Sequence, residues 1–299
     1  MNRTNSLVIP FPGQERLAGS IARQLQIPTG LMHLHHFPDG ESLVRLPEDL
    51  AGRDLLIVCS LEQADHRAMP LMFLAETARE FGARRVGLIA PYLGYMRQDK
   101  RFHPGEAITS ALFARFLSTH FDLLVTVDPH LHRHHSLDEI YTIPAISLHA
   151  ADTIARWIGS EISNPVLIGP DEESEQWVAE VAARAGAPFT VLTKTRHGDS
   201  NVEVSVPEVA KYAHHTPVLV DDIISTGMTM IETTRHLLAA GMLAPVCVGV
   251  HAVFADDACE RMQHNGIGRI VTCNTIPHAT NGIDISPLLA AAIANHWAE

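Results

Sequence analysis

The stretch VLVDDIISTGMTM, residues Val218 to Met230, decides the fold. An apolar run, Val218–Val220, meets two carboxylates, and a loop of small and hydroxyl-bearing residues then leads into a helical pattern over Met230–Ala240. This succession predicts a buried strand, a tight loop and a helix whose first N–H groups have no partner within the helix. Those N–H groups and the positive end of the helix dipole favour an anion such as phosphate.

The residue types in this stretch suit a phosphate that carries a sugar. Hydroxyl groups donate hydrogen bonds to phosphate oxygens, and glycine lets the backbone approach closely. Paired carboxylates at a strand end accept bonds from sugar hydroxyls or hold a divalent cation. The candidates are Asp221, Asp222, Ser225, Thr226, Gly227 and Thr229. An ordinary strand–turn–helix with a threonine N-cap is the alternative interpretation.

Composition restricts the class of protein. The 299 residues are 46% hydrophobic and 19% charged, and the net charge of −12 argues against a nucleic-acid-binding surface. The four cysteines lack CxxC spacing, and Cys59 and Cys247 lie in apolar runs, which favours free buried thiols. The first residues do not form a signal-peptide pattern, and no apolar run is long enough to span a membrane. We therefore expect a cytoplasmic protein with no nucleic-acid or membrane partner.

Short apolar runs alternate with amphipathic helical patterns along the chain, which predicts an α/β fold with parallel sheets. The second half also repeats the first. At offsets of 159, 162 and 161, the matched positions are Ile9 and Ile168, Val58 and Val220, and Ile89 and Val250. Three matches in the same order indicate a duplication. We predict two similar domains, residues 1–146 and 147–299, each a mainly parallel sheet flanked by helices.

The duplication allows an internal comparison of the two loops. The segment of the first half that corresponds to the Asp221–Thr229 loop is Cys59–His66, and it lacks both the acidic pair and the glycine. We expect one sugar-phosphate loop per chain, in the second half.

Other segments combine polar residues in patterns that suit ligands. They are Phe37–Glu41 (FPDGE), Pro91–Arg101 (PYLGYMRQDKR), Asp128–His135 (DPHLHRHH), Gly169–Glu173 (GPDEE) and Lys194–Asp199 (KTRHGD). The Asp-Gly pair in the first predicts a tight turn. Arginine and aromatics after a parallel strand suit a nucleotide, and histidine with aspartate suits a metal. The Lys194–Asp199 cations suit a loop that closes over an anion. Exposed loops are the alternative for each.

The His-x-His pattern after a strand is also found in metal-dependent amidohydrolases. That class needs a (β/α)₈ barrel with further ligands on later strands. A two-domain repeat does not fit such a barrel, so we rank this alternative last.

With these segments in this order, the chain resembles ribose-phosphate diphosphokinases (phosphoribosyl pyrophosphate synthetases), which have a phosphoribosyltransferase-like fold. The resemblance covers nearly the whole chain, and the KTR and DPH forms are similar to the archaeal-type branch. It implies two duplicated phosphoribosyltransferase-like domains. It also implies an oligomer in which the ATP site is shared between subunits.

The resemblance assigns roles residue by residue. The loop VDDIISTGMT, now including Met228, would bind ribose 5-phosphate. The ATP-binding residues would be Phe37, Asp39, Gly40, Glu41, Arg97 and Gln98. Mg²⁺ would lie at His130 and Asp171, and Lys194 and Arg196 would lie on the catalytic loop. The chain departs from the family pattern at Ser225, where aspartate is common, and at Met228, where a small residue is common.

The implied reaction transfers the diphosphoryl group of MgATP to the C1 hydroxyl of ribose 5-phosphate, giving phosphoribosyl pyrophosphate and AMP. One alternative is a phosphoribosyltransferase that consumes this product, but such an enzyme does not need the FPDGE and RQDK segments or a second domain. Another is a non-catalytic regulatory subunit associated with the synthetase, which we would expect to lack Lys194 and Arg196.

Overall fold

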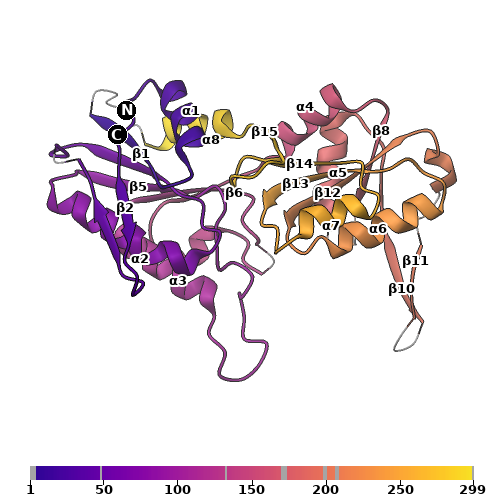
Figure 1. The fold of residues 1–299 in the computed structure, drawn as a ribbon, viewed down its shortest axis with the longest axis horizontal. Coiled ribbons are helices and arrows are strands. Elements are labelled where there is room, and N and C mark those ends of the chain that lie inside the picture. Colours follow the sequence, from indigo (N-terminus) through magenta and orange to yellow (C-terminus); the bar gives the residue numbers. More distant parts are fainter. Residues whose placement is uncertain are drawn as a thin grey trace. The chain divides into compact units, whose positions relative to one another are not determined.

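The computed structural model describes residues 5–47, 49–131, 133–169, 174–197, 201–205 and 209–297, with the backbone alone for 193–197, 201–205 and 209–210. The chain divides into two compact units. Unit 1 comprises Met1–His149 and Ser286–Glu299, and unit 2 comprises Ala150–Ile285. In each unit, helices cover both faces of a central sheet (Figure 1).

A parallel sheet of five strands forms the centre of unit 1. In spatial order the strands are β1 (Ser6–Pro10), β4 (Asp54–Val58), β5 (Arg85–Ile89), β6 (Leu123–Val127) and β7 (Ala145–Leu148). Every residue of β4 and β6 is buried. This burial explains their continuous apolar runs, because a parallel sheet is covered on both faces.

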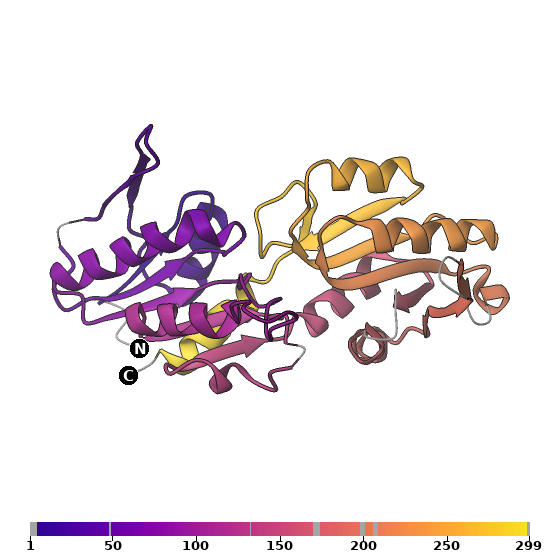
Figure 2. The same cartoon turned by 90° about the horizontal axis from the view of Figure 1, so that it is seen from below.

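Four helices cover the unit 1 sheet. The helices α1 (Glu15–Leu25) and α8 (Ser286–His296) lie on one face, and α2 (Ala64–Glu80) and α3 (Thr109–His120) lie on the other (Figure 1). An antiparallel hairpin of β2 (His33–His36) and β3 (Ser42–Arg45) projects from the unit (Figure 2). A 3₁₀ turn, η1 (Leu137–Glu139), follows β6.

Unit 2 has a parallel sheet of six strands. In spatial order they are β15 (Asn281–Ile283), β14 (Arg269–Cys273), β13 (Val246–Ala252), β12 (Thr216–Ile224), β8 (Pro165–Gly169) and β9 (Phe189–Val191). Its helices are α4 (Ala151–Glu161), α5 (Glu175–Ala185), α6 (Met228–Ala239) and α7 (Ala258–His264). A hairpin of β10 (Thr193–His197) and β11 (Asn201–Ser205) and a 3₁₀ turn, η3 (Val209–Tyr212), precede β12.

The two units follow the same plan, as the repeat in the sequence predicts. The strands β1, β4 and β5 contain Ile9, Val58 and Ile89, and their counterparts β8, β12 and β13 contain Ile168, Val220 and Val250. Each unit also carries a two-stranded hairpin, which lies between α1 and β4 in unit 1 and between β9 and β12 in unit 2. The predicted fold class, two α/β domains with mainly parallel sheets flanked by helices, is confirmed.

Two helices, α4 and α8, do not pack on the unit of the strand that precedes them. Helix α8 follows β15 of unit 2 but contacts α1, β6 and β7 of unit 1, and α4 follows β7 of unit 1 but contacts α5 and β15 of unit 2. The predicted division into 1–146 and 147–299 therefore differs from the units in two ways. The first join lies at 149/150, and residues 286–299 belong to unit 1. The amphipathic pattern of a helix does not specify which sheet it covers.

Two further features bear on the class of protein. Within the described residues, no helix is long and apolar enough to cross a membrane. All four cysteines are free, and Cys59, Cys247 and Cys273 are buried. Burial raises the pKa of the Cys59 thiol to about 12, so this thiol stays protonated and unreactive.

Trp297, just after α8, holds that helix on unit 1. Its side chain is 2% exposed, and the Arg85 guanidinium lies 4.2 Å from the centroid of its ring. We predict that Trp297→Ala lowers the free energy of unfolding by about 3–5 kcal/mol, because it leaves a large cavity. Urea unfolding of the full chain measures the loss. Trp157→Ala, at a half-buried tryptophan of α4, is the matched control and should cost less. Equal losses in the two variants would contradict the prediction.

Candidate functional site

Two carboxylates lie at the carboxyl-end edge of the unit 2 sheet. Asp221 and Asp222 are half-buried in β12, which continues to Ile224 because β13 pairs with it as far as Ala252. The strand is thus longer than the apolar run predicts. Asp221 Oδ1 accepts a hydrogen bond from the Asp222 N–H at 3.0 Å, and Asp222 Oδ1 accepts one from the Ile223 N–H at 2.8 Å. These local bonds fix the orientation of both carboxylates.

The loop after β12 needs a glycine at position 227. Gly227 is the N-cap of α6 and has φ 69°, in the left-handed region that favours glycine. A Cβ atom there would also lie 2.6 Å from the Met262 sulfur. Thr226 Oγ1 accepts a long hydrogen bond, 3.5 Å, from the Met228 N–H, and the Ser225 carbonyl accepts one from the Ala255 N–H at 3.2 Å. These two hydrogen bonds, one within the loop and one to the segment after β13, hold the loop in place.

The N-terminus of α6 suits an anion. The N-cap residue Gly227 has no side chain to cap it, the bond from Met228 to Thr226 is long, and the first N–H groups of a helix have no partner within the helix. The Met228 side chain is 55% exposed, so its bulk lies outside the core. The hydroxyls of Ser225, Thr226 and Thr229 flank the same turn in the sequence. Hydroxyl donors and the positive end of a helix are therefore separated from the two carboxylates by one short loop.

The corresponding loop of unit 1 is filled by an ion pair. Arg67 of α2 donates to the Ser60 carbonyl at 2.5 Å and to the Glu62 carboxylate, which is also half-buried. Gln63, with φ 53°, is the N-cap of α2 and occupies the position that Gly227 has in unit 2. The N-cap residue has a positive φ in both units, but in unit 1 the Glu62 carboxylate and its partner Arg67 occupy the loop. One sugar-phosphate loop per chain, in unit 2, stays a prediction.

The predicted catalytic cations and one predicted metal ligand are only partly within the described chain. Lys194 and Arg196 lie on β10, where the backbone pairs them with Val204 and Val202, and their side chains lie outside the description. Asp171 lies outside the described residues. The last strand before it, β8, ends at Gly169 and is the parallel neighbour of β12, so the described parts of these two strands end at the same edge of the sheet.

The FPDGE segment forms the tip of the β2–β3 hairpin. The Phe37 N–H donates to the Glu41 carbonyl at 2.8 Å, and the Gly40 N–H donates to the Phe37 carbonyl at 2.9 Å. Asp39 Oδ1 accepts the Glu41 N–H at 3.1 Å. The predicted tight turn is therefore confirmed, and Gly40 adopts φ 93° within it. Phe37 is 40% exposed, and its ring makes a T-shaped contact with the His35 ring, with the two centroids 4.8 Å apart.

The loop after β5 carries Arg97 and Gln98, and Glu106 closes it. Glu106 Oε2 accepts hydrogen bonds from the Phe102 N–H (2.8 Å), the His103 N–H (3.0 Å) and Gln98 Nε2 (3.0 Å). The backbone bonds, the one from His103 foremost, lower the pKa of Glu106, so the carboxylate stays ionised and the loop stays closed. Gln98 Nε2 also donates to the Lys100 carbonyl at 3.1 Å. Gln98 thus has a structural role here, while Arg97 is exposed.

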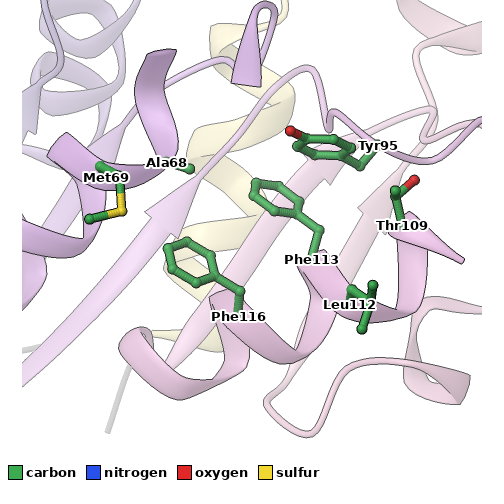
Figure 3. Close-up of a pocket in the computed structure, with 7 residues that line it drawn as sticks. All are labelled: Ala68, Met69, Tyr95, Thr109, Leu112, Phe113 and Phe116. Atoms are coloured by element: carbon green, nitrogen blue, oxygen red, sulfur yellow. The ribbon is translucent and has the colours of Figure 1, made fainter. Parts of the chain in front are cut away.

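Tyr95 anchors the start of this loop. Its ring lies 4.7 Å from the ring of Phe113 on α3, in the wall of a groove between α2 and α3 (Figure 3). The groove, about 310 Å³ in volume, is lined by apolar side chains with Thr109 and the Tyr95 hydroxyl. Because it offers no charged side chain, it does not suit a polyphosphate.

The segment after β6 turns sharply before His130. Asp128 has φ 37°, and its N–H donates to the Leu148 carbonyl at 2.8 Å. A hydrogen bond of 3.0 Å joins Asp128 Oδ1 to His149 Nδ1. His130 is half-buried two residues later. Within the described residues, no group of three or more His, Cys, Asp or Glu side chains could hold a metal ion.

The histidine-rich run that follows has a structural role in part. His134 Nδ1 lies 3.2 Å from Glu139 Oε2, and the His135 N–H donates to Glu139 Oε1 at 3.0 Å. These bonds, with the His135 backbone bond first, lower the pKa of Glu139 and fix the turn at η1. His132 lies outside the described residues. Sequence reasoning missed Glu106 and Glu139. Each carboxylate accepts hydrogen bonds that fix a loop, and no pattern in the sequence marks either residue.

The predicted residues therefore form separate groups. Asp221 and Asp222 lie with Ser225–Thr229 in unit 2, and Arg97 and His130 lie in the segments that follow two neighbouring strands of unit 1. Phe37 is on the hairpin, which projects apart from the loop after β5 in Figure 2.

Comparison with known proteins identifies the family of the chain. A family model described as the N-terminal domain of ribose phosphate pyrophosphokinase matches residues 7–120, and one described as a phosphoribosyl transferase domain matches residues 136–287. The chain is 33% identical to the ribose-phosphate pyrophosphokinase of Methanopyrus kandleri over 94% of this chain and 96% of the relative. It is 32% identical to that of Sulfolobus acidocaldarius over 88% and 92%.

A solved structure gives the same result. The phosphoribosylpyrophosphate synthetase from Mycobacterium smegmatis matches with a TM-score of 0.85 and 25% identity over 99% of both chains. The fold and the α6 loop define this chain as a protein built from phosphoribosyltransferase-type domains. The matches along its whole length are more specific: the chain belongs to the ribose-phosphate pyrophosphokinase family.

Gly227→Ala should destabilise unit 2 more than Gly241→Ala. Both glycines have positive φ, 69° and 82°, so each alanine costs about 1 kcal/mol of backbone strain. At Gly227 the new Cβ also meets Met262, whereas nothing lies within 4 Å at Gly241. Urea unfolding of both variants measures the difference. Equal losses would show that the close approach to Met262 is unimportant.

Proposed function

We propose that this chain is a ribose-phosphate diphosphokinase that makes phosphoribosyl pyrophosphate and AMP from ribose 5-phosphate and MgATP. In the reaction, the C1 hydroxyl oxygen of the sugar bonds to the β-phosphorus. The bond between that phosphorus and the α,β-bridging oxygen breaks, and AMP leaves with the bridging oxygen. The observation that carries the proposal is the loop at the N-terminus of α6 beside the two β12 carboxylates.

Unit 2 would hold the sugar phosphate. The N–H groups at the start of α6 and the hydroxyls of Ser225, Thr226 and Thr229 would bind the 5-phosphate. Asp221 and Asp222 would accept hydrogen bonds from the ribose hydroxyls, since both carboxylates already have a fixed orientation. Gly227 keeps the backbone close, and Met228 contributes its backbone rather than its exposed side chain. Serine at position 225 supplies a neutral donor in place of a carboxylate.

Unit 1 would hold the nucleotide. Arg97 would pair with phosphate oxygens, and the loop containing Gln98 would give the site its shape. The exposed face of Phe37 would stack on adenine, with Asp39, Gly40 and Glu41 forming the tip that presents it. Because the hairpin projects apart from the loop after β5 (Figure 2), Phe37 would serve the site of a second copy of the chain. A homo-oligomer, a dimer or larger, follows from this sharing.

His130 and Asp171 would hold Mg²⁺ with the triphosphate. Mg²⁺ takes only one or two protein ligands when phosphate oxygens and water supply the rest, so a pair of this kind suffices. When bound, the ion neutralises charge on the triphosphate. The hydrogen bonds of Asp128 to Leu148 and His149 fix the turn that presents His130.

Lys194 and Arg196 would stabilise the charge that develops on the transferred group. In this class of reaction the protein mainly positions the reactants and neutralises charge. Their presence also counts against a non-catalytic regulatory subunit. The second unit and the closed loop after β5 count against a phosphoribosyltransferase that consumes the product. Free buried thiols fit a reducing compartment, and we place the protein in the cytoplasm on that ground.

The function is tested by incubating the purified chain with ribose 5-phosphate, ATP and Mg²⁺ and following AMP by chromatography. AMP that appears only when the sugar is present is the expected result. Formation of ADP alone, or no nucleotide product, would refute the proposal.

Lys194→Ala should reduce the rate of AMP formation by about a hundredfold or more, because it removes one electrostatic contact to the transition state. Circular dichroism should show an unchanged fold. Lys211→Ala, at an exposed lysine of the same unit, is the matched control and should keep the parent rate. A normal rate in Lys194→Ala would remove this residue from the catalytic group.

A further inference from the structure

Asp99 is a nearly fully buried carboxylate in the loop after β5, and it lies one residue beyond Gln98. Its side chain is 3% exposed. Arg133, in the segment after β6, donates from Nη1 to both carboxylate oxygens, at 2.8 Å and 3.1 Å. Burial of a carboxylate is costly unless a partner compensates its charge. Arg133 supplies that compensation from a different segment of the chain.

The two segments leave the same edge of the unit 1 sheet. The strands β5 and β6 are parallel neighbours, with Ile89 paired to Val125, so both segments begin at their carboxyl ends. The Val127 N–H also donates to the Pro91 carbonyl at 3.2 Å, which ties the two segments at their base. Farther out, the Asp99–Arg133 ion pair joins them through side chains.

An aromatic ring supports the outer side of the ion pair. The Arg133 guanidinium carbon lies 5.8 Å from the centroid of the Phe102 ring, and Lys100 Nζ lies 5.0 Å from the same centroid. Glu106 fixes the backbone at Phe102 by accepting its N–H. Arg133 is therefore held on one side by a buried carboxylate and on the other by a ring whose backbone is fixed.

We propose that the Asp99–Arg133 ion pair is a positioning device that sets the distance between the nucleotide loop and the metal-binding segment. This inference rests on the proposed function, in which Arg97 contacts the phosphates of ATP and His130 contacts the Mg²⁺ on those phosphates. One end of the pair lies two residues from Arg97, and the other lies three residues from His130. The pair thus connects the parts that would hold one substrate at two points.

The test removes the charge of Arg133 and keeps much of its length. Arg133→Gln should raise the KM for ATP about tenfold and lower kcat, because the loop loses its fixed distance from His130. The KM for ribose 5-phosphate should stay unchanged, since its site lies in unit 2. Arg133→Lys keeps the charge and should restore most of the affinity for ATP. Folding should survive in both, because the Arg133 side chain is 46% exposed.

A second ion pair of unit 1 provides the matched control. Arg79 Nη2 lies 3.0 Å from Asp122 Oδ2, and this pair joins the end of α2 to the start of β6, away from both segments. Arg79→Gln should leave both KM values and kcat at the parent level. If Arg79→Gln and Arg133→Gln change the KM for ATP equally, the Asp99–Arg133 pair is merely structural and the proposal is overturned.

Coupling between the partners is measured with Asp99→Asn and the double variant. If both residues act through one pair, the double variant should bind ATP no more weakly than the weaker single variant. Additive losses would overturn the proposal.

Calorimetric titration of MgATP in the absence of sugar separates this inference from the function. A parent chain that binds ATP without forming AMP would refute the reaction but still allow the pair to be tested by affinity. A parent chain that does not bind ATP would refute both, and parent-like affinity in Arg133→Gln would overturn the positioning role.

Discussion

The parallel hydrogen bonding of β12 to β13 is the constraint on which the proposed sugar-phosphate site depends. It extends to Ile224 and Ala252, beyond the apolar part of the strand, and holds Asp221 and Asp222 in a regular backbone. A short loop then leads from β12 to α6. Glycine is required at position 227 of this loop because Met262 leaves no room for a side chain there. A rigid strand before the loop and a packed helix after it fix the loop from both ends.

The same architecture serves a different role in unit 1. There the equivalent loop is filled by Arg67 and Glu62, and the proposed ATP and metal residues Arg97 and His130 lie in the segments after β5 and β6. Glu106 closes the first of these segments and Asp99 joins it to the second. Duplicated domains thus keep their sheet and helices, because burial of apolar surface requires them. The exposed strand ends diverge, because packing does not restrict them.

The exchange of terminal helices ties the two halves of the chain together. The chain passes from unit 1 to unit 2 before α4 and returns before α8. Trp297, packed on Gly87 and Arg85, fixes the return. A sequence repeat indicates which segments correspond but not which sheet each helix covers, because an amphipathic helix can bury its apolar face against either sheet. This is why the predicted join and the assignment of residues 286–299 differ from the units.

The sequence by itself determined the parallel α/β fold and the duplication and indicated the candidate ligand segments, because strand burial, helix periodicity and turn residues are local patterns. It predicted the turn at Gly40 and the need for Gly227 for the same reason. Only the tertiary structure decided how far β12 extends, which sheet α8 covers and how Arg133 meets Asp99. Such contacts join residues far apart in the chain, and their energies depend on burial and distance, which no local pattern records.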